Sequence, residues 1–273
     1  MDWLEIAGNW VLIPRKPLGI IHFLGGAFVA TLPHITYRRL LEFLAQQGYV
    51  VIATPFVNTF EHTTIAENVL WQFDRTVYAL EDRYMSARNL PVYGMGHSMG
   101  CKLHLLIGSL YEVKRSGNIL ISFNNFAAKD SIPMMDQVAQ MMSQFAPQMN
   151  AITPPEFTPS PEATNQIVRD RYEVSNNLLV KFSNDTLDQT RPLSVILDDR
   201  FPGRTEIAKL KGNHMTPVAQ DLKWTPNPNF TPLDTLGSWF RQEVFRELEQ
   251  LEQEISYWLR QSETVRREES NLS

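Results

Sequence analysis

One serine in this chain stands in a pattern that could make it a nucleophile. Ser98 is the centre of the string GHSMG, residues 96 to 100, which matches G-x-S-x-G. The string follows a β-rich run at residues 90 to 93 and precedes a run with helical spacing of its apolar residues. A sharp strand-to-helix turn strains the residue at its tip, and the flanking glycines let the strand and the helix approach it closely. The pattern therefore predicts that Ser98 is displayed at the carboxyl end of a sheet, where it could attack an acyl group.

With this turn, the sequence resembles the α/β-hydrolase superfamily. Members carry a catalytic triad in the chain order nucleophile, acid, histidine, each on a loop that follows a strand. The resemblance covers the chain from about Gly19 to Pro217. The strings HFLGGAF (22–28), GMGHSMG (94–100) and GNHMTP (212–217) are also similar to a poorly characterised hydrolase-like group of cyanobacteria and plastids, carried as a domain of unknown function. This resemblance implies a fold more than a substrate.

The triad order points to His214 as the base. Of the six histidines, only His214 follows the last predicted strand, and the loop 212–217 corresponds to the one on which the superfamily carries its base. The other five are interpreted as structural, because they lie in a predicted strand, near helix starts, at the variable position of the turn or on the helix behind it: His22, His34, His62, His97 and His104.

The acid is chosen by topology. Four aspartates lie between residue 175 and His214: Asp185, Asp188, Asp198 and Asp199. The acid and base loops must be separated by a crossover helix that, with its strands, needs at least about 10 to 12 residues. Asp199 is too close to His214, whereas Asp185 directly follows the predicted strand 177–182 and leaves room for a helix around residues 193 to 197. We predict Asp185 as the acid, with Asp188 as the alternative.

Acyl transfer also needs backbone N–H donors where the oxyanion forms. The resemblance implies one donor from the residue after the nucleophile, Met99, and one from the loop after an earlier strand, where either Gly26 or Ala27 could supply it. Cys101 could be proposed as a second nucleophile, but a single cysteine on such a helix is more typical of a small buried hydrophobe.

The elements that must position these residues alternate between short β-rich runs and helical spacing, which is typical of parallel strands joined by crossover helices. We predict an α/β fold of the α/β-hydrolase type, with a mostly parallel sheet and helices on both faces. The predicted strands are 19–24, 49–53, 90–93, 118–122, 177–182 and 206–210. The core would comprise residues 1–125 and 176–262, and residues from 263 to 273 would form a frayed tail.

Residues 126–175 break this regularity and are predicted to form a lid insertion rich in methionine and proline. An amphipathic helix is expected here, and its apolar face would contain four methionines that could bind substrate: Met134, Met135, Met141 and Met142. Two interpretations stay open at this point. The face could pack on the main body as ordinary core, or it could form a mobile lid over an apolar pocket.

A final helix is expected because apolar residues recur at three- and four-residue steps at positions 240, 244, 248, 251, 255 and 258. This helix could lie on the sheet, or it could form a coiled-coil contact in a homodimer.

Composition excludes several classes of function. The 273 residues carry a net charge of -5 and no polybasic run, so nucleic acid is not an expected partner. A single cysteine cannot form an intrachain disulfide, which favours a reducing compartment such as the cytoplasm or, in a plastid, the stroma. The longest apolar run, Leu18 to Leu32, is shorter than the roughly 18 to 20 residues of a membrane span. We therefore expect a soluble protein without a transmembrane segment.

The sequence thus favours a serine hydrolase that cleaves an ester or thioester with an apolar or acyl portion. No metal, nucleotide or flavin is called for, because the chain has neither a phosphate-binding glycine motif before a helix nor a His/Cys ligand cluster. The alternative is a catalytically silent protein of the same fold that serves as a scaffold or binds a ligand.

Overall fold

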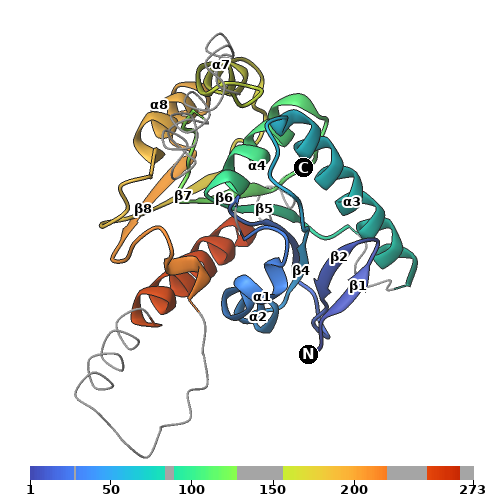
Figure 1. Ribbon diagram of the computed structural model, residues 1–273. Helices are drawn as coiled ribbons and strands as arrows, with labels where there is room; N and C mark the ends of the chain where they lie inside the picture. Colours follow the sequence, from blue (N-terminus) through green and yellow to red (C-terminus); the bar gives the residue numbers. More distant parts are fainter. Residues whose placement is uncertain (28, 84–88, 128–155, 220–244, 265–273) are drawn as a thin grey trace, which may run out of the picture.

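A computed structural model describes residues 1–27, 29–83, 89–127, 156–219 and 245–264 (Figure 1). Its eight strands form one sheet. They are β1 (Leu4–Ile6), β2 (Asn9–Leu12), β3 (Gly19–Leu24), β4 (Tyr49–Ala53), β5 (Val92–His97), β6 (Gly117–Ile121), β7 (Asn177–Phe182) and β8 (Thr205–Leu210). The strand order is β1-β2-β4-β3-β5-β6-β7-β8, and all pairs from β4 to β8 are parallel. This confirms the predicted α/β fold with a mostly parallel sheet.

The hairpin of β1 and β2 adds two antiparallel strands at the β4 edge of the sheet. The hairpin turns at Ala7 and Gly8, whose φ angles are 50° and 83°. Strands of three and four residues are too short to show an alternation of apolar and polar positions, so the sequence does not predict this hairpin.

The described helices are α1 (Pro33–Thr36), α2 (Arg38–Gln46), α3 (His62–Arg83), α4 (Met99–Leu110), α7 (Pro161–Arg171), α8 (Thr190–Arg200) and an unlabelled helix at 245–264, together with the short 3-10 helix η3 (Thr216–Val218). Figure 1 shows α2 and helix 245–264 on one side of the sheet, and α3, α4, α7 and α8 on the other. Among the described residues, no helix is both long enough and apolar enough to cross a membrane.

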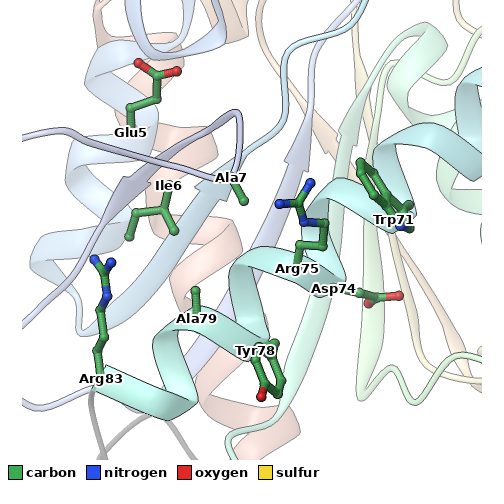
Figure 2. Close-up of a pocket in the computed structure, with 9 residues that line it drawn as sticks. All are labelled: Glu5, Ile6, Ala7, Trp71, Asp74, Arg75, Tyr78, Ala79 and Arg83. Carbon is green, nitrogen blue, oxygen red and sulfur yellow. The ribbon is translucent and has the colours of Figure 1, made fainter.

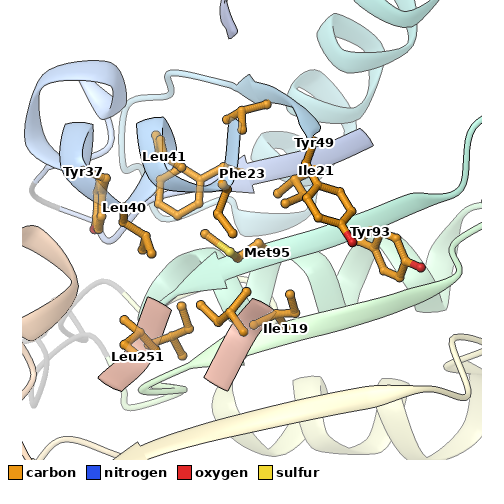
Figure 3. Packing of buried hydrophobic residues seen from close by; sticks show 14 of the residues in the cluster. Ile21, Phe23, Tyr37, Leu40, Leu41, Tyr49, Tyr93, Met95, Ile119 and Leu251 are labelled. Atoms are coloured by element: carbon orange, nitrogen blue, oxygen red, sulfur yellow. The ribbon is translucent and has the colours of Figure 1, made fainter. Parts of the chain in front are cut away.

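Two apolar layers result from the alternation of side chains along each strand. Ile21 and Phe23 of β3 face α2 and helix 245–264, whereas Ile20 and Leu24 face α3 and α4. Figure 3 shows the first layer, where Leu41 of α2 and Leu251 of the last helix approach strand residues such as Met95. The parallel strands are buried on both faces, which is why they read as continuous apolar runs in the sequence.

Helix 245–264 packs on the sheet of its own chain. Leu248, Leu251, Ile255 and Trp258 are all at most 1% exposed, so these side chains are not free to form a coiled coil with a second copy. The helix continues to residue 264, past residue 263, where a frayed tail was expected to begin. The Glu263 carboxylate accepts a 2.6 Å hydrogen bond from the Tyr49 hydroxyl, which ties this end of the helix to β4.

The end of the predicted insertion belongs to the main body. Helix α7 packs against α4 and α8, and Tyr172, directly after it, is fully buried. The predicted methionine-faced helix, with Met134, Met135, Met141 and Met142, lies outside the described residues.

Candidate active site

Ser98 occupies the turn between β5 and α4. Its φ and ψ are 55° and −118°, a conformation that residues with a Cβ rarely adopt. Two backbone hydrogen bonds hold the turn: the Ser98 N–H donates to the Ile121 oxygen at 2.9 Å, and the Cys101 N–H donates to the Ser98 oxygen at 3.1 Å. The strained backbone thus places the serine at the carboxyl end of the sheet, between the last residue of β5 and the first of α4.

The two glycines of the motif are required by close backbone contacts. A Cβ at Gly100 would lie 2.1 Å from the Leu24 carbonyl oxygen, and a Cβ at Gly96 would lie 2.5 Å from the Cys101 nitrogen. Real side chains cannot come so close to backbone atoms, so only glycine allows β3, β5 and α4 to meet here.

His214 and Asp185 are joined by a hydrogen bond. His214 Nδ1 lies 2.9 Å from Asp185 Oδ2, and the side chains are 17% and 0% exposed, respectively. Burial acts to raise the pKa of the Asp185 carboxyl, but hydrogen bonds from His214 and the Leu187 N–H outweigh it and lower that pKa. The carboxylate form is therefore favoured beside the imidazole, as an orienting acid requires.

Asp188, the alternative acid, is engaged elsewhere. Its Oδ1 lies 2.8 Å from Lys181 Nζ, and its carboxylate also accepts from the N–H and the hydroxyl of Thr190 at the start of α8. These contacts are those of a partly buried ion pair and of a turn that leads into α8. Asp199, which lies too close to His214 in the chain to be the acid, is exposed on α8.

The backbone N–H groups that were expected to stabilise the oxyanion are not all free to donate a hydrogen bond to a substrate. The Gly26 N–H donates to the Tyr37 hydroxyl at 2.8 Å, so it is already used, contrary to one of the two expectations for this loop. Met99 is the first residue of α4, where an N–H has no acceptor within the helix. Among the described residues, no acceptor contacts the N–H of Ala27 or that of Met99. Of the three expected donors, the N–H groups of Ala27 and Met99 are therefore the two that could still contact an oxyanion.

Sequence reasoning missed the role of His97 in joining three loops. Because the Tyr37 hydroxyl accepts from Gly26, its one proton is free to donate to His97 Nδ1 at 2.7 Å. The proton of His97 is then on Nε2, which donates to the backbone oxygen of His214 at 2.9 Å. Burial and the neighbouring His214 lower the pKa of His97 to about 3, which keeps this ring neutral. A single sequence carries no signal for such a chain of contacts.

Ser98 and His214 line the same cavity, whose volume is about 260 Å³. Seven of the other fourteen lining residues have apolar side chains: Ala27, Val29, Met99, Phe126, Phe157, Leu187 and Met215. Six are polar, namely Asn58, His62, His97, Lys102, Asn124 and Asn125, and Gly26 is the fourteenth. Cys101 is fully buried, and its thiol donates hydrogen bonds to the backbone oxygens of Gly96 and Ile121. Burial raises the pKa of this thiol well above the usual range. That thiol is a structural group and not a second nucleophile.

A larger cavity of about 660 Å³ lies between the β1–β2 turn and α3 (Figure 2). It is lined by residues such as Ile6, Trp71 and Arg75, and none of its lining residues is a serine, cysteine or histidine. Among the described residues, moreover, no group of three or more His, Cys, Asp or Glu side chains is placed to hold a metal ion.

Solved structures of several hydrolases share this fold. An esterase of Pyrococcus furiosus is 15% identical and superposes with a TM-score of 0.57, covering 95% of this chain and 90% of that one. The monoacylglycerol lipase of Paleococcus ferrophilus is 14% identical, with a TM-score of 0.55 and coverage of 96% and 100%. Carboxyl esterase 2 of the fungus Tuber melanosporum is 17% identical, with a TM-score of 0.53 and coverage of 89% and 87%. The shared fold is that of the α/β-hydrolases.

No curated protein matches the chain. A family model matches residues 2–261, which include the strained turn of Ser98 and the loops of Asp185 and His214. The chain therefore belongs to the family described as "Protein of unknown function (DUF1350)".

Proposed function

We propose that this protein is a serine hydrolase that cleaves an ester or thioester with Ser98, His214 and Asp185. The observation that carries the proposal is the 2.9 Å hydrogen bond between His214 Nδ1 and Asp185 Oδ2, on loops that follow β8 and β7, beside a cavity shared with Ser98. Such a bond fixes the imidazole with its Nε2 unprotonated, which is the form that can accept a proton from a serine hydroxyl.

In the proposed reaction, Ser98 Oγ attacks the carbonyl carbon of the substrate while His214 Nε2 takes the hydroxyl proton. The N–H groups of Ala27 and Met99 stabilise the resulting oxyanion. As the bond to the leaving group breaks, His214 returns the proton to the leaving atom. That atom is the oxygen of an ester or the sulfur of a thioester, and it departs as an alcohol or a thiol. Water then repeats the sequence on the acyl-enzyme and releases a carboxylic acid and free Ser98.

The decisive test is covalent labelling with a fluorophosphonate at neutral pH. We expect an adduct on Ser98 of the folded protein and none in Ser98→Ala. Serines outside such a site do not react at a comparable rate, so the labelled peptide identifies the nucleophile. If the folded wild type acquires no adduct, the catalytically silent ligand-binding alternative replaces the hydrolase.

The apolar lining of the cavity supports an acyl or otherwise apolar portion in the substrate. The four methionines at 134, 135, 141 and 142, which lie outside the described residues, are proposed to extend this surface. The test is the ratio of kcat/KM for long- and short-chain 4-nitrophenyl esters. Met141→Ala combined with Met142→Ala should lower that ratio, because lost apolar contacts are worth about 1 to 3 kcal/mol each. An unchanged ratio in folded protein would remove these residues from the substrate site.

A further inference from the structure

A buried lysine borders the cavity that contains Ser98. Lys102 lies four residues after Ser98, one turn along α4 and on the same face of that helix. Only 2% of the residue is exposed, although lysine is almost never fully buried unless it is paired. The mechanism proposed above does not use this side chain, so its burial at the cavity calls for another explanation.

The ammonium of Lys102 has few partners for a buried charge. Its Nζ donates to the Pro159 carbonyl at 2.9 Å and lies 5.7 Å from the centre of the Phe157 ring. Among the described residues, no carboxylate lies within ion-pair distance of it. Burial lowers the pKa of Lys102 to about 8, although the more distant Glu156 and Glu162 act to raise it. The group is still mostly protonated at pH 7, with one strong acceptor for three N–H donors.

A second polar group without a partner lies at the same cavity. His62, at the start of α3, is 2% exposed, and neither ring nitrogen has a hydrogen-bond partner among the described residues. Its ring packs against Phe157 with 4.3 Å between the ring centroids, and Phe157 is the same ring whose centre lies 5.7 Å from Lys102 Nζ. Burial lowers the pKa of His62 to about 3, so the ring is neutral and offers one N–H donor. Buried polar groups without partners are rare in folded proteins and call for a ligand or a water.

We propose that the substrate of this hydrolase carries a carboxylate at a distance from the scissile bond, and that Lys102, assisted by His62, binds this carboxylate. The inference rests on the proposed function and narrows its substrate class. One helical turn between Ser98 and Lys102 is about 6 Å along the axis, which suits a short apolar chain between the two ends of the substrate. A cavity of about 260 Å³ is also small for a ligand site, which favours such a compact molecule.

The charges favour a carboxylate over a phosphate monoester. Lys102 supplies one positive charge and His62 is neutral, so a group with one negative charge would be balanced in the cavity. A doubly charged phosphate would leave a buried charge uncompensated, which is costly in an apolar site. Phe126, Phe157 and Leu187 would contact the apolar chain between the two ends.

The test compares two substrates with the same six-carbon acyl chain, one anionic and one neutral: the mono-4-nitrophenyl ester of adipic acid and its methyl-capped counterpart. We expect wild type to have the higher kcat/KM for the charged ester. Lys102→Met should abolish that preference, with a fall of about 10-fold or more for the charged ester and little change for the neutral one. Lys114→Met, which removes an exposed lysine just beyond the same helix, is the matched control and should keep the preference.

The outcomes separate this inference from the proposed function. If Lys102→Met slows both esters equally, Lys102 is a structural tether for the Pro159 segment and the inference is wrong. If wild type labels with the fluorophosphonate but prefers the neutral ester, the hydrolase stands and the carboxylate site is wrong. Calorimetric binding of monomethyl adipate and dimethyl adipate to Ser98→Ala needs no turnover. Tighter binding of the anion, lost when Lys102→Met is added, would support the site even if the protein proves not to be a hydrolase.

Discussion

The imidazole Nε2 of His97 donates a hydrogen bond to the backbone oxygen of His214, 2.9 Å away. The residue just before the candidate nucleophile thus holds the loop that carries the candidate base. Tyr37 keeps His97 in the required tautomer and also accepts from the Gly26 N–H. The loops after β3, β5 and β8 are therefore linked by one chain of buried hydrogen bonds.

Tyr37→Phe removes the hydroxyl at the centre of this chain. We expect the rate of fluorophosphonate labelling of Ser98 to fall about 10-fold, because the His214 loop and the Gly26–Ala27 loop lose their common anchor. The free energy of unfolding should fall by about 1 to 3 kcal/mol, since the buried Gly26 N–H and His97 Nδ1 lose their partner. Both are measured on the purified variant, by mass spectrometry and by urea titration. Tyr78→Phe, which removes a hydroxyl from a side chain 76% exposed, should change neither value.

The two candidate acids should separate cleanly. Asp185→Asn should lower kcat by about ten-thousand-fold with the fold intact, because the amide no longer holds the imidazole in the reactive tautomer. Asp188→Asn should keep the rate and instead lower the free energy of unfolding by about 1 to 3 kcal/mol, since it weakens the partly buried contacts with Lys181 and Thr190. Steady-state hydrolysis of a 4-nitrophenyl ester, with urea unfolding of the same samples, distinguishes them. The reverse pattern would make Asp188 the acid.

Mild acid should destabilise the fold through its buried histidines. Burial lowers the pKa of His62, His97 and His104 to about 3, whereas an unfolded histidine titrates near 6.5. Between these values the unfolded chain binds more protons than the folded one, so the free energy of unfolding falls as pH drops from about 6.5 toward 3. Each ring contributes up to about 1.4 kcal/mol per pH unit. Urea titrations at pH 7, 6 and 5 should show this trend, and equal stabilities at the three pH values would contradict it.

Gly100→Ala should disrupt the turn of Ser98. The added methyl would meet the Leu24 carbonyl oxygen at 2.1 Å, and neither backbone can move without separating β3 from α4. We expect a loss of about 4 kcal/mol or more in unfolding free energy, measured by thermal and urea denaturation. Gly108→Ala is the matched control on the same helix, because its methyl would meet the side chain of Tyr172 at 2.8 Å, which can shift more easily than backbone. A smaller loss at Gly100 than at Gly108 would contradict this account.

Local spacing was enough to predict the six parallel strands and the turn of Ser98. Parallel strands that are buried on both faces appear in the sequence as continuous apolar runs. The glycines of the turn are required because adjacent backbone segments lie too close for a Cβ. Strand β5 nevertheless continues to His97, beyond the predicted end at residue 93, because glycine-rich residues do not read as a strand. Counting the residues that a crossover needs excluded Asp199 as the acid, and Asp185 was preferred because it directly follows the predicted strand 177–182. The structure places Asp185 beside His214.

Contacts between distant residues were not accessible to this reasoning. The Gly26 N–H was weighed as an oxyanion donor, and its use by Tyr37 depends on how α2 packs over the sheet. The burial of Lys102 follows from the segment near Pro159 that covers it, 57 residues away in the chain. A charged residue in a helical run reads as a solvent-facing position until such a segment is placed over it.

The packing of helix 245–264 has a consequence for synthesis of the protein on the ribosome. Trp258 fills a site against Tyr93 of β5 and Gly117 of β6, and Leu251 completes the same layer. Because the ribosome adds about 5 to 20 residues per second, these strands leave it several seconds before the helix that covers them. During that interval one face of the nascent sheet presents apolar side chains to water and to other chains, a surface of the kind that chaperones bind.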